Sequence, residues 1–110
     1  MIPLKPENLT STTTSSKRRS YHWVFDKHEL DISIDPNTIW IQTDNANLIA
    51  GLKCEKRFFG YEYPHLINWI QNSPKAVNII SWFGNTTLFM DFLVAEHQEI
   101  VNPEQHELDL

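Results

Sequence analysis

Residues 21–43 are YHWVFDKHELDISIDPNTIWIQT, the most informative stretch of this sequence. Aromatic and β-branched residues are frequent in it, and apolar residues alternate with polar ones at Leu30, Ile32 and Ile34. This pattern is typical of strands that bury one face. Turn-forming residues separate the apolar runs at 26–29 and 35–37. The stretch therefore predicts a three-stranded antiparallel meander.

The apolar spacing changes after Asp44. Four apolar residues then recur at the spacing of one helix face: Leu48, Ile49, Leu52 and Phe59. They follow a group of N-capping residues at 43–45, so we predict a helix that ends at Gly60. A second helix is predicted over residues 63–72, because Pro64 is tolerated in the first helical turn and an apolar stripe follows it.

The C-terminal part of the chain allows two interpretations. Residues 76–83 are apolar and β-branched, and Gly84-Asn85 suits a two-residue hairpin turn, so a strand pair up to residue 95 is favoured. Residues 86–100 also fit a helical stripe, and this alternative stays open. The expected fold is α+β: an antiparallel sheet, made of the N-terminal meander and a C-terminal hairpin, with two helices packed on one face.

Two polar segments flank a predicted single domain over residues 21–101. Residues 1–20 contain two prolines, a Ser/Thr run and few large apolar residues, which predicts a flexible arm. This arm is basic because it holds Lys17, Arg18 and Arg19, whereas residues 96–110 hold five acidic residues and no lysine or arginine. Residues 102–110 are expected to form a fraying acidic tail.

Composition excludes several classes of protein. A chain of 110 residues has room for one hydrophobic core. It contains no apolar run near the ~20 residues that cross a bilayer and no secretory signal pattern. The lone Cys54 cannot form an internal disulfide, unlike the cysteines of most small secreted domains. We therefore expect a soluble cytoplasmic protein.

Residues suited to catalysis or metal binding are not grouped in the sequence. The five histidines are spread over the chain and no two have the i, i+4 spacing of a helical metal site. Cys54 has no recognisable activating base. The three glycines lie too far apart for a phosphate-binding loop. We expect no metal, no cofactor and no catalytic residue, and hence a protein that is not an enzyme.

Aromatic residues give the strongest candidate binding surface. The stretch RFFGYEYPH, residues 57–65, places four aromatics and an arginine around a predicted helix break, and such residues are favoured at the centres of interfaces. Strand alternation sends Trp40 to the face opposite the predicted core. The candidate partner-binding residues are Arg57, Phe58, Tyr61, Tyr63 and Trp40. The competing interpretation is that Phe59 and Tyr63 only hold the two helices together.

These features predict a small non-enzymatic protein–protein interaction module. The net charge of −5 suits a basic partner, as in inhibitors, immunity proteins or antitoxins, and self-association as a homodimer is another form of such binding. The alternative is a nucleic-acid-binding accessory protein that uses the arm and the segment 53–59. Its candidate residues are Lys17, Arg18, Arg19, Lys53 and Lys56, although the acidic body argues against it.

Overall fold

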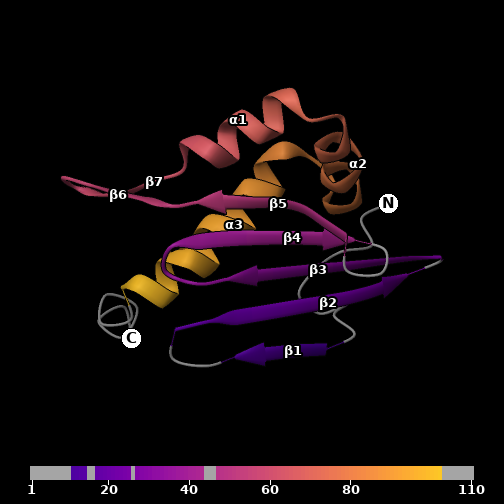
Figure 1. The fold of residues 1–110 in the computed structure, drawn as a ribbon, viewed down its shortest axis with the longest axis horizontal. Helices are drawn as coiled ribbons and strands as arrows, with labels where there is room; N and C mark the ends of the chain where they lie inside the picture. Colours follow the sequence, from indigo (N-terminus) through magenta and orange to yellow (C-terminus); the bar gives the residue numbers. More distant parts are fainter. Residues whose placement is uncertain (1–10, 15–16, 26, 44–46, 103–110) are drawn as a thin grey trace.

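The computed structural model describes residues 11–14, 17–25, 27–43 and 47–102 (Figure 1). Five strands form one antiparallel sheet in sequential order: β1 (Ser11–Thr14), β2 (Arg19–Phe25), β3 (His28–Ile34), β4 (Thr38–Thr43) and β5 (Asn47–Lys53). A two-stranded hairpin follows, made of β6 (Glu55–Arg57) and β7 (Gly60–Glu62). Three helices complete the fold: α1 (Pro64–Asn72), α2 (Pro74–Phe83) and α3 (Thr86–Val101). The fold class is therefore α+β.

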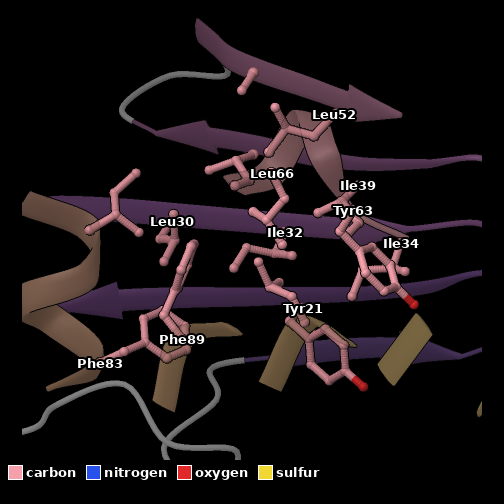
Figure 2. Close-up of a cluster of buried hydrophobic side chains, with 14 of the residues drawn as sticks. Tyr21, Leu30, Ile32, Ile34, Ile39, Leu52, Tyr63, Leu66, Phe83 and Phe89 are labelled. Atoms are coloured by element: carbon pink, nitrogen blue, oxygen red, sulfur yellow. The ribbon is translucent and has the colours of Figure 1, made fainter. Parts of the chain in front are cut away.

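The hydrophobic core lies between one face of the sheet and the helices (Figure 2). Fully buried strand residues such as Leu30, Ile32 and Ile41 pack with Leu66 of α1 and Phe89 of α3 in a single cluster. No helix in the described part of the chain covers the opposite face, which carries polar pairs such as Ser20 and Ser33. Alternation along the strands thus separates a buried face from an open one.

The meander predicted from residues 21–43 is confirmed. Strands β2, β3 and β4 pair antiparallel, with Tyr21 opposite Ile32 and Ile32 opposite Ile41. Asp35 organises the tight turn between β3 and β4, because its carboxylate accepts hydrogen bonds from the backbone N–H groups of Asn37 and Thr38, each at 2.8 Å. This is the local side-chain bonding that makes aspartate a turn residue.

The helix predicted between Asp44 and Gly60 is wrong, because residues 47–62 form β5, β6 and β7. The reason is a β-bulge. Ile41 pairs with Ala50 but Gln42 pairs with Leu48, so Ile49 is an extra residue in β5. One extra residue breaks the alternation of a strand. Leu48, Ile49 and Leu52 therefore showed the spacing of a helix face although they lie in a strand.

The favoured C-terminal hairpin is also wrong, and its helical alternative is correct. Residues 74–83 form α2 and residues 86–101 form α3, so three helices replace the two that were expected. Gly84, with φ +115°, ends α2, and Asn85 caps α3 by accepting a hydrogen bond from the backbone N–H of Leu88 at 2.9 Å. The pair Gly-Asn suits a helix junction as well as a hairpin turn.

Replacing Asn85 with alanine is expected to lower the free energy of unfolding by about 1 kcal/mol, because it removes this cap. The melting temperature should fall by roughly 4–8 °C. Thermal unfolding followed by circular dichroism measures the change, with Gln71→Ala, an exposed change on α1, as the control. An Asn85→Ala midpoint equal to that of the control would contradict the cap.

The N-terminal segment differs from the flexible arm expected over residues 1–20. Ser11–Thr14 form β1, which pairs with β2, and β2 already begins at Arg19. The Arg19 guanidinium lies 2.9 Å from a carboxylate oxygen of Glu96 and 3.3 Å from one of Glu99, both on α3. The hydroxyl of Tyr21 also donates to Glu96. Residues 1–10, 15–16 and the tail from 103 to 110 lie outside the described residues, so their expected flexibility stays a prediction.

Replacing Arg19 with alanine is expected to lower the free energy of unfolding by about 1–3 kcal/mol, because it leaves a mostly buried carboxylate without its cation. Burial raises the pKa of Glu96, and the hydrogen bond from Arg19 opposes that rise. Without Arg19 this pKa rises further. A raised carboxyl pKa stabilises the fold at low pH, and that stabilisation is lost as pH rises through the raised pKa.

The loss of unfolding free energy in Arg19→Ala should therefore be largest near neutral pH. It should shrink as the pH falls toward the ordinary glutamate pKa of about 4.3. Urea unfolding at several pH values measures it, with Lys17→Ala, an exposed change, as the control. A deficit that is the same at acidic and neutral pH, or no deficit relative to the control, would show that the ion pair contributes nothing.

Candidate functional site

The hairpin β6–β7 projects away from the sheet and the helices, between the end of β5 and the start of α1 (Figure 1). Arg57 pairs with Gly60, so Phe58 and Phe59 are the two residues of the turn at the tip. Gly60 has φ +146°, a conformation that residues with a Cβ atom rarely adopt. The glycine therefore closes a tight turn that holds two adjacent aromatic residues at the end of the hairpin.

The two tip phenylalanines are almost completely exposed. Phe58 is 93% exposed and Phe59 is 96% exposed, whereas the other large apolar side chains exposed in the described part of the chain range from 37% to 63%. The two rings contact each other edge to face with their centroids 4.9 Å apart. Burying a phenylalanine side chain contributes about 1.5–3 kcal/mol. The fold makes no use of this contribution at the tip.

Charged side chains line the hairpin behind its tip. Arg57 Nη2 lies 3.0 Å from Glu55 and Arg57 Nε lies 3.2 Å from Glu62. His65 Nε2, at the start of α1, lies 3.8 Å from the other oxygen of Glu55. Exposed ion pairs of this kind contribute little to stability. They do hold the Arg57 guanidinium along the hairpin, where it forms a polar border behind the two rings.

The base of the hairpin is anchored on His97, which is fully buried on α3. The ring of Tyr61 packs edge-on against the imidazole with the centroids 4.7 Å apart. His97 Nε2 lies 3.0 Å from the carbonyl oxygen of Pro36, and His97 Nδ1 lies 2.8 Å from the hydroxyl of Tyr63. A carbonyl oxygen only accepts hydrogen bonds, so Nε2 carries the proton and the Tyr63 hydroxyl donates to Nδ1.

The groups around this anchor are poorly suited to nucleophilic chemistry. Burial raises the pKa of the Cys54 thiol to about 12, and the charge of Asp35 adds to the rise, so the thiol stays protonated at neutral pH. Burial also raises the pKa of Tyr63 to about 12, against a hydrogen bond from Gln98 that lowers it. No group of three metal-ligating side chains occurs among residues 11–14, 17–25, 27–43 and 47–102.

The hairpin brings together three of the five predicted partner-binding residues, Arg57, Phe58 and Tyr61. Tyr63 lies at the base and is buried against His97. The structure also places Phe59 at the tip, although its sequence spacing suggested a helix core. The sequence did contain a signal for a hairpin. The segments on either side of Phe58-Phe59 are short and mostly polar, and Gly60 directly follows the pair.

Trp40 lies on the open face of the sheet rather than on the hairpin. It is 37% exposed, and its indole lies across Gly51 of the neighbouring strand, since a Cβ atom on Gly51 would stand 2.9 Å from the indole ring. The indole N–H donates to Asp35 at 3.3 Å. Local packing on a glycine thus explains the position of Trp40 without a partner.

The residues considered for nucleic-acid binding do not gather on one surface element. Arg19 lies on β2 and is held by the carboxylates of Glu96 and Glu99. Lys53 ends β5, and Lys56 belongs to β6 of the hairpin. Lys17 and Arg18 precede β2. One basic residue of the predicted arm, Arg19, is therefore already paired within the fold.

Comparison with known proteins gives no match to a family model, a curated protein or a solved structure. Within the described part of the chain, the helices are too short or too polar to traverse a lipid bilayer.

Proposed function

We propose that this protein is a small non-enzymatic interaction module that inserts the tip of its β6–β7 hairpin into an apolar pocket of a protein partner. The observation that carries the proposal is the near-complete exposure of Phe58 and Phe59 at the tip. A soluble fold rarely leaves two adjacent aromatic rings without any cover, and aromatic residues that fill a partner's pocket dominate the energy of many interfaces.

The geometry of the tip favours a concave partner surface. The turn between Arg57 and Gly60 fixes the backbone on both sides of the rings, so little conformational freedom is lost when they bind. Arg57 lies behind the rings and is held by Glu55 and Glu62, which fits the polar rim that surrounds an apolar interface centre. The net charge of −5 favours a basic protein as the partner, in the manner of an inhibitor, immunity protein or antitoxin.

Capture from the native cell tests this proposal with three baits. The wild-type chain, the double variant Phe58→Ser/Phe59→Ser and the control Val77→Ser are compared by quantitative mass spectrometry. Val77 is an exposed apolar residue on α2, so its change removes a similar kind of surface elsewhere. The partner is the protein that the wild type and the control retain and the double variant loses.

Two results would overturn the proposal. The first is that the three baits retain the same proteins after purification and rebinding. The second is that the wild type, but not the double variant, co-sediments with phosphatidylcholine vesicles, which would make the tip a membrane anchor. A low-salt titration with random oligonucleotides is expected to show no binding; steeply salt-dependent binding would favour the nucleic-acid alternative.

A further inference from the structure

The base of the hairpin contacts one buried imidazole, that of His97. His97 donates through Nε2 to Pro36 and accepts through Nδ1 from Tyr63, and Tyr63 itself accepts a hydrogen bond from Gln98 at 2.9 Å. Every buried side-chain nitrogen and oxygen in the described part of the chain has a hydrogen-bond partner. The network is complete only while Nδ1 carries no proton.

A second proton on His97 disrupts this network. A proton on Nδ1 would face the hydroxyl hydrogen of Tyr63, which would then have to turn away and find another acceptor. The groups that face the ring from other elements are Asp35 and Pro36 on the β3–β4 turn and Tyr61 and Tyr63 on the hairpin side. Asp35 is the only carboxylate among them.

Burial lowers the pKa of His97, while the hydrogen bond to Pro36 and the charge of Asp35 oppose that change. The folded protein therefore resists protonation at a pH where a solvated histidine, with a pKa of about 6.5, already accepts a proton.

The base of the hairpin is also attached to the body outside His97: the backbone N–H of Cys54 donates to the carbonyl oxygen of Asn37 at 2.8 Å, and Tyr63 belongs to the core cluster. Strands β6 and β7 pair with each other, and neither makes extended backbone contact with another described element. The ring of Tyr61 and the hydroxyl of Tyr63 reach the body at His97. The sheet, by contrast, is held by long strand ladders and a continuous core. Opening at His97 thus requires the hairpin base and Tyr63 to move, whereas the strand ladders of the main sheet do not pass through His97.

We propose that proton uptake by His97 releases the hairpin from the body, so that the Phe58–Phe59 tip is held in its projecting position at neutral pH and becomes mobile on acidification. The inference rests on the proposed function only for what the tip binds, because the release itself is a property of the isolated chain. A partner would then bind most tightly at neutral pH and dissociate as the pH falls.

Linkage gives the expected size and sign of the effect. In the open state His97 is solvated and titrates near pH 6.5, whereas in the closed state its pKa is lower. Above pH 6.5 His97 is neutral in both states, so the ratio of open to closed molecules does not change with pH. Below it only the open state binds the proton, so the open fraction rises by up to about tenfold per pH unit until the closed state titrates as well.

Amide hydrogen exchange measured by NMR between pH 7.5 and 5 tests the proposal on the full chain without a partner. After correction for intrinsic exchange rates, protection of the Cys54 amide, which donates to Asn37 across the base of the hairpin, should fall by up to about tenfold per pH unit below pH 6.5. Protection at Ile32 and Ile41 in the sheet should stay constant. His97→Gln keeps a donor for Pro36 but cannot be protonated, and should abolish the pH dependence.

The matched control is His65→Gln, which removes the exposed histidine nearest to the hairpin and should leave the pH dependence unchanged. If His97→Gln does not fold, Tyr63→Phe replaces it: loss of the hydroxyl that favours the neutral ring should bring the closed-state pKa of His97 nearer to the solvated value, so the fall in protection between pH 6.5 and 5 should become smaller.

Three results would overturn the proposal: hairpin-base and sheet amides that lose protection together, a pH dependence that survives His97→Gln, or a fall in protection that is as large in Tyr63→Phe as in the wild type. None of them depends on whether the tip binds a partner, so failure of the proposed function gives a different result.

Discussion

Replacing Phe89 with alanine is expected to lower the free energy of unfolding by about 3–5 kcal/mol, since it empties a large volume at the centre of the core. Phe89 is completely buried, and its ring contacts Phe83 at a centroid distance of 5.3 Å and Trp69 at 6.3 Å. It therefore joins all three helices at one point. A small domain has a total stability of about 5–15 kcal/mol, so this variant should be close to unfolding at room temperature.

The adjacent change Leu88→Ala is the matched control. Leu88 is 45% exposed on the same helix, and alanine favours a helix, so its effect should stay within about 1 kcal/mol. Urea unfolding of the two variants measures the difference. Similar losses for Leu88→Ala and Phe89→Ala would contradict the helical assignment of residues 86–101 and the position of α3 over the sheet.

Replacing Phe58 and Phe59 together with serine is expected to weaken partner binding by at least about a hundredfold, because each aromatic residue that fills a pocket contributes roughly 2 kcal/mol or more. The loss should appear mainly as faster dissociation. The melting temperature should change little, since both rings are more than nine-tenths exposed in the free chain. Binding and stability are thus expected to separate cleanly in this variant.

Sequence patterns could predict the part of the fold in which each strand alternates without interruption. Residues 21–43 formed the expected meander because Leu30, Ile32 and Ile41 keep a strict period of two. The pattern failed at Ile49, an extra bulge residue. It interrupted the alternation of apolar and polar residues, so the apolar residues had the spacing of a helix face. It also failed at Gly84-Asn85, since a glycine followed by asparagine serves a helix end and a helix cap as well as a turn.

The candidate site could be predicted only in part. The aromatic stretch at 57–65 was recognisable, but the role of Phe59 depended on the hairpin that the bulge obscured. His97 had no local signal, because its partners Pro36 and Tyr63 are distant in the sequence. A single histidine does not reveal which side chains the fold brings to it.

The most direct test of the docking hairpin is a kinetic binding titration by biolayer interferometry with the partner identified by capture. The wild-type chain and Val77→Ser should bind with the same affinity, and Phe58→Ser/Phe59→Ser should bind at least about a hundredfold more weakly through faster dissociation. Circular dichroism of the same samples should show equal melting temperatures. An affinity of the folded double variant equal to that of the wild type would contradict the account, because the partner would then bind a surface other than the hairpin tip.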